Sequence, residues 1–343
     1  MMSPVAFIDL FSGMGGFTTG AINAGATCIV SIDSWAEANK VHLSNHPQVP
    51  YMTMELGHSS HWKVFKRMVD DYKRLGYHVH IHGSPPCQAL SNASRHNAEK
   101  GMPLVLWYLD LVERCVPDSW SMENVVPVRN RLPAGTPAVI LNSADFGVPQ
   151  TRRRCFAGEG WYAQTTHINR KAYPYALDKE SWVSVLDALP DIAEDLLMDS
   201  GRASAPTTGV NPRTGKKEGG SGPLFRSLSE PSYTILSSAR KLVLSSGNYG
   251  SSSSRRALSQ DREIHLPAKT VNNNTPSLRL ISDKPQKVRS LTMPETLVLQ
   301  GFPADYDMTA ARTQKARWTM IGNAVPPPVA EAVIRGIHHG VHN

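Results

Sequence analysis

The first 160 residues alternate between short apolar segments and helical stretches, and this alternation limits the fold more than any other feature of the sequence. The apolar segments have the length of buried strands and cover residues 5–11, 28–33, 78–82 and 119–125. The helical stretches cover residues 16–26, 35–43, 61–75 and 102–115. Strands that alternate with helices form a mostly parallel sheet with helices on both faces. The sequence therefore predicts an α/β fold for this part of the chain.

The composition changes after residue 163, which indicates a second unit. Gly, Ser, Pro and Asn accumulate in residues 200–225 and 245–254, as they do in loops and insertions. Helical periodicity returns over residues 292–300 and again after Pro326. We therefore expect a first domain over 1–163, a smaller β-rich domain over 164–303, and a segment over 304–343 that returns to the first domain.

One connection in the first domain is unusually short. Only residues 128–137, rich in Pro, Gly and Arg, separate the strand at 119–125 from an apolar segment at 138–142. A parallel crossover generally needs a dozen or more residues. We therefore expect an irregular sheet at this edge.

Basic residues are concentrated in one third of the chain. Residues 201–290 hold 15 Lys and Arg against 5 Asp and Glu, whereas the rest of the chain holds 21 against 24. Such segregation favours a polyanion as partner over a uniformly solvated surface. The four cysteines are widely spaced and form no Cys-x-x-Cys pair, so a reactive thiol is a better interpretation than a disulfide or a zinc site.

The sequence also bears on location and on metals. No apolar run approaches the ~18 residues of a membrane span, and no basic leader precedes the first apolar segment. We therefore expect a cytoplasmic protein without a membrane partner, or one of the nucleoid or nucleus if its host is viral or eukaryotic. His78, His80 and His82 point to one face of a predicted strand, where burial against a helix is a better interpretation than metal binding.

A glycine-rich segment, 9–17, lies where the first predicted strand passes into the first helix. Glycines there permit close approach of a ligand, and the helix N-terminus favours a negative group such as a carboxylate. Asp33 ends the second strand, where an acidic residue can bind ribose hydroxyls. The spacing indicates a ligand that carries adenosine, but it does not separate a dinucleotide from S-adenosylmethionine, and a plain tight turn remains the alternative.

Three further groups of residues suggest chemistry at the same edge of the sheet. Cys87 follows two prolines at the end of a strand, although a buried structural cysteine is the alternative. Glu123 ends the neighbouring strand, where a carboxylate is costly to bury unless it is paired or functional. Arg152 and Arg154 lie on one face of an extended segment, which alone would be an ordinary basic run.

Taken together, the motifs resemble the ordered motif set of the cytosine carbon-5 DNA methyltransferase family. They are Asp-Leu-Phe-Ser-Gly-x-Gly-Gly at 9–16, Pro-Pro-Cys-Gln at 85–88, Glu-Asn-Val at 123–125, Asp-Phe-Gly-Val-Pro-Gln-x-Arg-x-Arg at 145–154, Arg-x-Leu-Thr with Gln-Gly-Phe-Pro within 289–303, and Ile-Gly-Asn-Ala-Val-Pro-Pro at 321–327. They span almost the whole chain in the family's order. The resemblance implies a Rossmann-like, S-adenosylmethionine-dependent methyltransferase sheet over 1–163 with a target-recognition domain over 164–303.

The resemblance also implies a reaction. Cys87 would add to carbon 6 of a cytosine that has been rotated out of the duplex. Glu123 would bind ring nitrogen 3 and the exocyclic amine, and Arg154 would hold the carbonyl oxygen at position 2. Arg152 would support the loop or a phosphate. S-adenosylmethionine would give up its methyl group to carbon 5 and leave as S-adenosylhomocysteine.

Further residues are carried over from the family's motifs. The cofactor surroundings would be Asp9, Phe11, Ser12, Gly13, Gly15, Gly16, Asp33, Glu55, Pro86, Asn323 and Val325. Glu55 stands where the family more usually has Asp. The DNA contacts would include Gln88, Ser91 and Arg289. The implied partner is double-stranded DNA, bound by a monomer, and a cognate restriction endonuclease would be a separate chain.

Three alternatives remain at this point. A transfer-RNA cytosine-5 methyltransferase would share Cys87 and the Glu-Asn-Val motif. A catalytically inactive DNA-binding relative would be expected to lose one of Cys87, Glu123 and Arg154, all of which are present. A nucleotide-dependent dehydrogenase would leave Pro-Pro-Cys-Gln unexplained. The sequence specifies neither the recognised DNA sequence nor the host.

Overall fold

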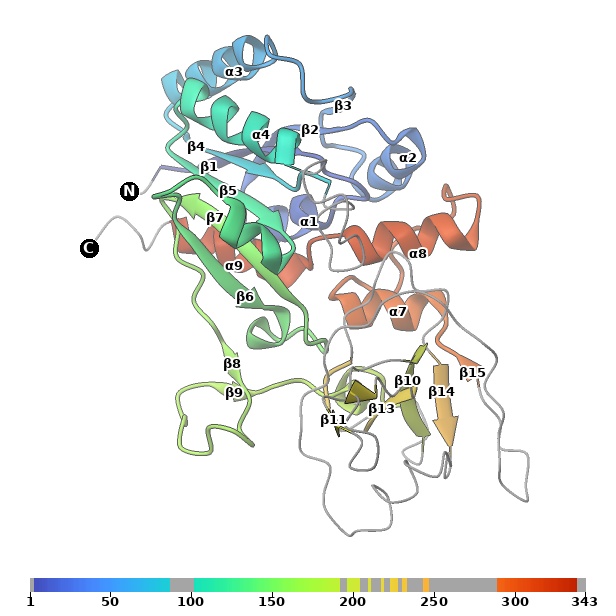
Figure 1. The fold of residues 1–343 in the computed structure, drawn as a ribbon. Helices are drawn as coiled ribbons and strands as arrows, with labels where there is room; N and C mark the ends of the chain where they lie inside the picture. The colour runs from blue at the N-terminus through green and yellow to red at the C-terminus, as the bar shows by residue number, and fades with distance from the viewer. Residues whose placement is uncertain are drawn as a thin grey trace.

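The computed structural model describes residues 3–86, 102–191, 230–232 and 291–337 with their side chains, and the backbone of short strands between 196 and 290. Its central element is a seven-stranded sheet in the order β3-β2-β1-β4-β5-β7-β6 (Figure 1). The strands are β1 (Val5–Leu10), β2 (Thr27–Asp33), β3 (Tyr51–Thr53), β4 (His78–Gly83), β5 (Ser119–Asn124), β6 (Ala138–Asn142) and β7 (Arg153–Glu159). The first five strands in chain order are parallel to one another, which confirms the predicted α/β sheet.

The edge after β5 is irregular, as the short connection predicted. A 3-10 helix, η2 (Val126–Arg131), leads from β5 to β6 at the outer edge of the sheet. Strand β7 then returns antiparallel between β5 and β6. Because β6 does not pair with β5, no crossover helix between adjacent parallel strands is needed. A second 3-10 helix, η3 (Ser143–Phe146), joins β6 to the segment before β7.

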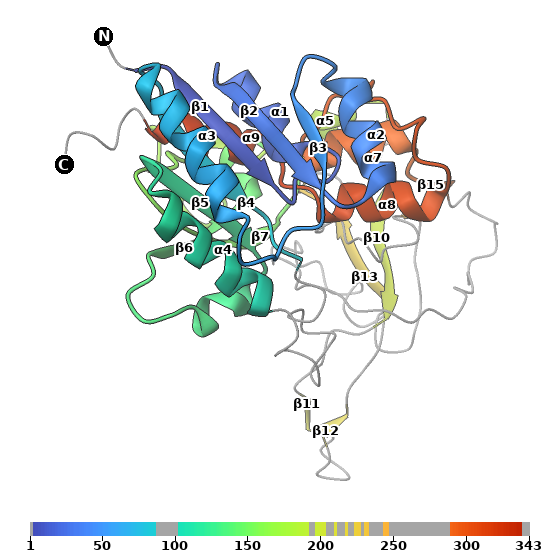
Figure 2. The same cartoon turned by 90° about the horizontal axis from the view of Figure 1, so that it is seen from above.

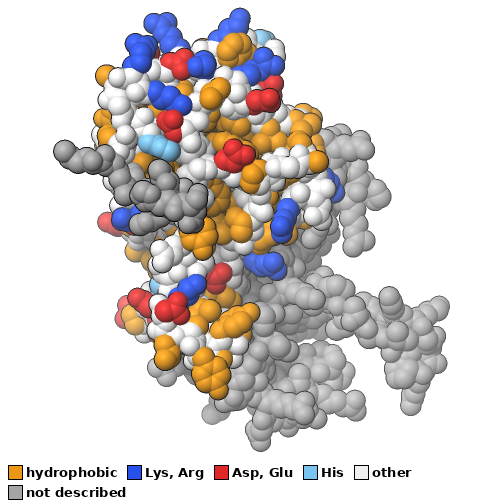
Figure 3. Space-filling view, turned by 90° about the vertical axis from the view of Figure 1, so that its left-hand side faces the viewer, with side chains coloured by type: hydrophobic (Ala, Val, Ile, Leu, Met, Phe, Trp, Pro, Cys, Tyr) orange, Lys and Arg blue, Asp and Glu red, His pale blue; other side chains and the backbone are white. Residues whose placement is uncertain are grey.

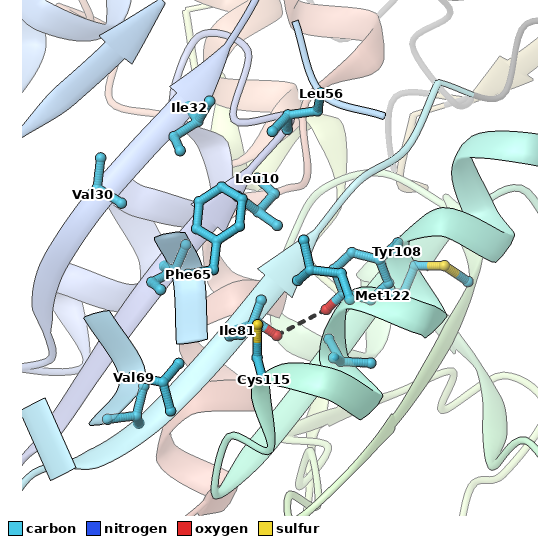
Figure 4. Close-up of a cluster of buried hydrophobic side chains, with 14 of the residues drawn as sticks. Leu10, Val30, Ile32, Leu56, Phe65, Val69, Ile81, Tyr108, Cys115 and Met122 are labelled. Atoms are coloured by element: carbon cyan, nitrogen blue, oxygen red, sulfur yellow. Dashed lines mark hydrogen bonds between the residues drawn. The ribbon is translucent and has the colours of Figure 1, made fainter. Parts of the chain in front are cut away.

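Helices cover both faces of the sheet (Figure 2). Helices α3 (Trp62–Arg74) and α4 (Met102–Cys115) bury Phe65, Val69 and Tyr108 against one face. Figure 4 shows this cluster, in which the Tyr108 hydroxyl donates to the carbonyl of Ile81 at 2.9 Å. Helices α1 (Gly16–Asn23) and α9 (Pro327–Ile337) cover the other face with Phe17, Val329 and Val333 among others.

A third apolar cluster joins distant parts of the sequence. Helix α2 (Ala36–Asn45) contributes Ala38 and Val41, and it shares this core with α7 (Met293–Gln300) and α8 (Gln314–Asn323). Helix α7 begins with a Thr292–Glu295 capping box. Its residues Leu297 and Leu299 are buried with α8, so α7 packs with residues beyond position 303, where the sequence predicts a domain boundary.

The middle of the chain forms small sheets. A four-stranded antiparallel sheet has the order β13-β10-β14-β15 and lies next to α7 and α8 in Figures 1 and 2. Its strands are β10 (Leu196–Ala203), β13 (Pro223–Ser227), β14 (Val243–Ser246) and β15 (Arg289–Ser290). The remaining elements are β8 (His167–Ile168), β9 (Glu180–Ser181), α5 (Val185–Ala188), β11 (Gly209–Val210) and β12 (Lys217–Glu218). The domain boundaries at 163 and 303 stay predictions.

The face in Figure 3 carries many Lys and Arg side chains at its upper end, where α3 lies. Several are paired with neighbouring carboxylates: Lys66 with Asp70, and Arg74 with Asp71. This charge is therefore that of an ordinary solvated helix surface. Among the described residues, none of the helices has the length and apolar character that crossing a bilayer requires.

Candidate active site

The carboxyl ends of the parallel strands bring most of the predicted site residues to one edge of the sheet. Asp9 lies in β1, Asp33 ends β2, and Glu123 lies near the end of β5. Glu55 follows β3, and Pro86 follows β4. The sheet order runs outward in both directions from the β1–β4 pair, and ligands of open α/β sheets bind at such a switch point.

The glycine-rich turn after β1 has an unusual backbone that is bonded to β2. Phe11, Gly13 and Gly15 all have positive φ, at 60°, 53° and 95°. A positive φ is strained for Phe11, and strain of this kind clusters at ligand sites. The Gly13 N–H donates to the Asp33 carboxylate at 2.8 Å, and the Ser12 N–H donates to the Ile32 carbonyl at 3.0 Å. The end of β2 therefore holds the turn in place.

Asp33 also receives a hydrogen bond from the N–H of Trp35 at 2.8 Å. One N–H thus meets each carboxylate oxygen, and each oxygen keeps a second lone pair. The carboxylate is partly exposed and fixed in orientation, so it can accept further hydrogen bonds from ligand hydroxyls.

Asp9 and Ser12 occupy buried positions around the same turn. Asp9 is 1% exposed, and its carboxylate accepts from the Thr18 hydroxyl at 2.7 Å. Burial raises the pKa of Asp9 to about 7, against the smaller lowering effect of Thr18. These contacts make Asp9 a support beneath the turn. The Ser12 Oγ is also buried, and it lies beside the Tyr51 hydroxyl.

The C-terminal motif, residues 321–327, packs directly against helix α1. A Cβ atom on Gly16 would stand 2.2 Å from the carbonyl oxygen of Val325, and one on Gly20 would stand 2.1 Å from that of Pro327. Both positions therefore require glycine. Val325 is buried, whereas Asn323 is exposed at the end of α8. At Gly16, the backbone of α1 is therefore in close contact with the backbone of Val325.

Arg152 is buried and fastens the C-terminal motif. Its side chain is 1% exposed, and Nη2 donates to the carbonyls of Gly322 at 2.9 Å and Ala324 at 3.2 Å. This position fits the loop-supporting role that the sequence suggested for Arg152. It does not fit the phosphate contact suggested beside it, because the guanidinium is directed into the protein.

Two glutamines join the same buried network, and the sequence analysis assigned them no role. The Gln300 amide donates to the Ala324 carbonyl at 2.9 Å. The Gln150 amide donates to the Leu299 carbonyl at 3.0 Å and to Gln300 Oε1 at 2.8 Å. Gln150 belongs to the motif at 145–154 and Gln300 to the motif within 289–303, so their positions in these motifs were the signal that could have identified them. Their partners are distant in sequence, so the bonding was not readable from the motifs.

Glu123 and Arg154 form a partly enclosed ion pair. Arg154 Nε lies 3.1 Å from Glu123 Oε1, and the two side chains are 15% and 8% exposed. The antiparallel pairing of β5 with β7 brings them together. Burial raises the pKa of Glu123, although Arg154 and Arg152 act in the opposite direction. Glu123 is therefore a carboxyl group that keeps its proton to a higher pH than an exposed glutamate does.

The loop that leads to Cys87 starts from a fixed point. The Asn124 amide donates to the Pro85 carbonyl at 3.1 Å, and the Ser84 N–H donates to the Leu10 carbonyl at 3.1 Å. Pro86 is exposed. The predicted residues Cys87, Gln88 and Ser91 lie outside the described residues, and for Arg289 only the strand β15 is described. The roles predicted for these four stay predictions.

Glu55 and the histidines of β4 are the remaining residues for which the sequence led to an expectation. Glu55 is exposed just beyond β3, at the same end of the sheet as Asp33. His80 and His82 are fully buried, and their ring nitrogens face serine hydroxyls of neighbouring elements. For His80 and His82, the predicted burial against a helix is confirmed by the stacking of Phe17 on both rings, whereas His78 is half-buried.

Comparison with known proteins agrees with this geometry. The sequence matches the C-5 cytosine-specific DNA methylase family over residues 5–131 and 135–339. The chain therefore belongs to the C-5 cytosine-specific DNA methylase family, whose members use S-adenosylmethionine. This confirms the family that the motifs indicated.

Individual relatives are Type II methyltransferases. M.MthTI of Methanothermobacter thermautotrophicus is 26% identical over 359 residues, which cover 96% of each chain. M.HpaII of Haemophilus parainfluenzae is 29% identical over 192 residues, and that alignment spans 50% of each chain.

Two solved structures share the fold. DNMT2 of Spodoptera frugiperda has a TM-score of 0.58 at 16% identity and covers 97% of this chain and 99% of its own. A DNA modification methyltransferase encoded within a prophage (E. coli) has a TM-score of 0.53 at 21% identity, with coverage of 99% and 100%. The Rossmann-like methyltransferase fold is thereby confirmed.

The residues present fit S-adenosylmethionine. The positive-φ turn at 11–15 leaves room for close approach of the ligand, and the carboxylate of Asp33 is fixed with lone pairs to spare. A ligand with a carboxylate and ribose hydroxyls matches this set of groups.

Proposed function

We propose that this chain methylates carbon 5 of a cytosine in double-stranded DNA through a covalent adduct with Cys87. The observation that carries the proposal is the ion pair of Glu123 with Arg154 at the end of β5. It lies on the strand next to β4, whose loop leads to Cys87. When bound, S-adenosylmethionine supplies the electrophilic methyl group.

Glu123 supplies the proton chemistry in this proposal. Addition of the Cys87 thiolate to carbon 6 is easier when ring nitrogen 3 is protonated, and a carboxylic acid with a raised pKa can provide that proton. Arg154 orients the carboxyl group and holds the carbonyl oxygen at position 2 of the base. Arg152 acts behind them as a positioning residue, since it fastens the C-terminal motif.

The cofactor would be held by the turn after β1 and by Asp33. Phe11, Gly13 and Gly15 shape the surface, while Ser12 and Asp33 donate or accept hydrogen bonds. Gly16 and Val325 bring the C-terminal motif close, with Asn323 exposed beside them. We assign Glu55 and Pro86 to the rim of the same site, and Asp9 beneath it.

The DNA would be bound across the domain at 164–303. The basic balance of residues 201–290 provides phosphate contacts, which position a duplex without reading its sequence. Gln88, Ser91 and Arg289 are the proposed contacts nearer the rotated base. Extrusion of the base costs a few kcal/mol, roughly, which these contacts offset. We further propose a cytoplasmic monomer, with any cognate endonuclease on a separate chain.

Bisulfite sequencing tests the reaction and its site together. DNA from cells that express the wild-type protein is compared with DNA from cells that express Cys87→Ala. We expect protected cytosines at one fixed sequence with the wild type alone. Equal conversion in both samples would overturn the proposal. Methyl incorporation into purified duplex DNA and into transfer RNA, measured side by side, separates the two nucleic-acid substrates.

A further inference from the structure

Histidines of β4 and serines of the neighbouring elements form an unbroken ladder of hydrogen bonds along the α1 face of the sheet. The strands are in register, with His80 opposite Ser119 and His82 opposite Ser121. In order along the face, the ladder consists of His78, Ser119, His80, Ser121, His82 and Ser84. Its five contacts measure 2.9, 2.8, 2.8, 2.8 and 3.0 Å.

The ladder is closed to water along its middle. Ser119 is 1% exposed, and His80, Ser121 and His82 are fully buried. The Phe17 ring stacks on His82 with a centroid distance of 3.5 Å and lies 6.0 Å from His80. Only the two end residues, His78 and Ser84, are partly exposed.

The two ends lie at opposite edges of the sheet. Ser84 follows β4 at the catalytic edge, three residues before Cys87, and the pairing of Gly83 with Met122 brings it level with Glu123. His78 begins β4 at the far edge. Six residues of extended strand separate the two by roughly 20 Å.

A proton can pass along the ladder only if its hydrogens all point the same way. Burial lowers the pKa of His80 to about 3 and that of His82 well below its ordinary value, so both rings are neutral. A neutral imidazole has one N–H and one lone pair, and a serine hydroxyl has one hydrogen to donate. Because each hydroxyl donates only one hydrogen, a proton can pass along the whole ladder in two orientations: every ring protonated at Nδ1, or every ring protonated at Nε2.

The reaction itself creates a need for such a path. Transfer of a methyl group from a sulfonium to a ring carbon that carries hydrogen releases one proton per turnover. That proton appears in a site from which bulk water is excluded. We propose, on the basis of the function proposed above, that the ladder conducts the carbon-5 proton from the catalytic edge to His78.

Each transfer along the ladder breaks one bond to hydrogen and forms another. The carbon-5 to hydrogen bond breaks, its electron pair forms the carbon-5 to carbon-6 double bond, and the sulfur of Cys87 leaves with the pair of its own bond. A water molecule passes the proton to Ser84, whose hydroxyl hydrogen moves to His82 Nε2. The Nδ1 hydrogen of His82 moves on through Ser121, and the sequence repeats at His80 and Ser119. His78 gains a hydrogen at Nε2 and loses one from Nδ1 to water.

After this passage every ring is protonated at Nε2. A proton that enters at His78 and leaves through Ser84, while the pocket stands open to water between turnovers, restores the first orientation. No charge is left in the protein interior at the end of the cycle.

The test separates methyl transfer from proton loss in single-turnover reactions of the full chain. The DNA carries tritium at carbon 5, and the methyl group of the cofactor carries carbon-14. In Ser121→Ala the ladder is cut, so we expect tritium release to slow by about 100-fold, the scale of general acid–base effects. Methyl transfer should keep its wild-type rate, and the covalent protein–DNA complex should accumulate on denaturing gels. Ser119→Ala should behave in the same way, and Ser121→Thr should restore release because it replaces the hydroxyl.

Ser31→Ala is the matched control. Ser31 is a fully buried hydroxyl on β2, which β1 separates from β4, and it bonds Thr18 outside the ladder. Its loss should leave the ratio of tritium release to methyl transfer unchanged. Tritium release that keeps pace with methyl transfer in both alanine variants would overturn the relay. A wild-type protein that neither methylates nor releases tritium would instead refute the proposed function.

A second measurement uses the wild-type protein without DNA or cofactor and so is independent of activity and of variant stability. Imidazole nitrogen-15 chemical shifts report which ring nitrogen carries the proton. We expect His80 and His82 to be neutral and protonated at the same type of nitrogen. Opposite tautomers in the two rings would break the chain of donors and overturn the proposal.

Discussion

Arg154 Nε lies 3.1 Å from Glu123 Oε1, so a cation from an antiparallel strand faces the carboxyl group at the end of a parallel one. Neither side chain is well exposed, and the pair lies beside the strand that leads to Cys87. The relationship gives Glu123 two environments at once: burial, which favours its protonated form, and a cation, which favours its ionised form.

Replacement of Glu123 by Gln should show how far methyl transfer depends on the acidic proton of this residue. The amide keeps the shape of the side chain but lacks an acidic proton, so we expect the rate of methyl transfer to fall by about 100-fold to 10,000-fold. Binding of the cofactor product should stay near the wild-type level, because Asp33 and the glycine turn are untouched. Single-turnover rates and calorimetric binding of S-adenosylhomocysteine measure the two effects. A variant with full activity would exclude Glu123 as the proton donor.

Arg154→Ala should damage stability as well as activity. It leaves the Glu123 carboxyl group buried without its ion-pair partner, a loss that costs about 3 kcal/mol in buried pairs. The pKa of Glu123 should rise further, because the largest charge that opposes burial is removed. Urea denaturation and the pH profile of single-turnover methylation provide the measurements. Arg153→Ala is the control, since Arg153 is exposed on the same strand.

The burial of Arg152 leads to a prediction about salt dependence. Arg152→Ala should weaken cofactor binding because the Gly322 and Ala324 carbonyls lose their donor. DNA affinity should keep the same slope against salt concentration, since each lost phosphate contact changes that slope by roughly one unit. Arg152→Lys should not restore function, because an ammonium lacks the planar guanidinium geometry. A reduced salt slope would reinstate the phosphate contact.

Gly16→Ala should loosen the contact between α1 and the C-terminal motif. Its Cβ would stand 2.2 Å from the Val325 carbonyl oxygen, and a backbone atom cannot move away as a side chain does. We expect a loss of about 1–3 kcal/mol in the free energy of unfolding, the usual range for overpacking, together with weaker cofactor binding. Gly25→Ala is the control: its φ of +86° strains an alanine, whereas Gly16 has no positive φ, and its Cβ would meet nothing within 4 Å. A loss of stability at Gly16 no larger than the loss at Gly25 would contradict a destabilising contact with Val325.

Because Asp9 is buried, we expect the free energy of unfolding to depend on pH. Its pKa rises from 3.8 to about 7 on folding, because burial favours the protonated form. As pH rises from about 4 to 7, the unfolded chain releases this proton first, so the contribution to stability present at low pH is lost. Asp9→Asn removes that loss and should therefore gain stability relative to the wild type between pH 4.5 and pH 8. Urea denaturation at both values tests this, and a constant difference between the two proteins would contradict it.

The fold and the strand-end residues were readable from the sequence because periodicity and motif order report them directly. The single-face alternation of His78, His80 and His82 was visible too, but their partners were not. Ser119 and Ser121 lie about 40 residues away, and only the register of β4 with β5 brings them opposite. Register depends on packing across strands, which one segment's pattern does not specify. The roles of Gln150 and Gln300 could not be predicted either, because they depend on contacts between residues that are distant in sequence.

The contacts of Gly16 and Gly20 with the Val325 and Pro327 carbonyls also bear on when, during synthesis, the surroundings of helix α1 are complete. Helix α1 is made long before the carbonyls of Val325 and Pro327 that complete its surroundings. Closing so long a loop is slow, and folding rates fall as contacts become more distant in sequence. During synthesis, the surroundings of helix α1 are therefore incomplete until α9 has been made, and we expect a product that lacks α9 to bind S-adenosylmethionine more weakly than the full chain.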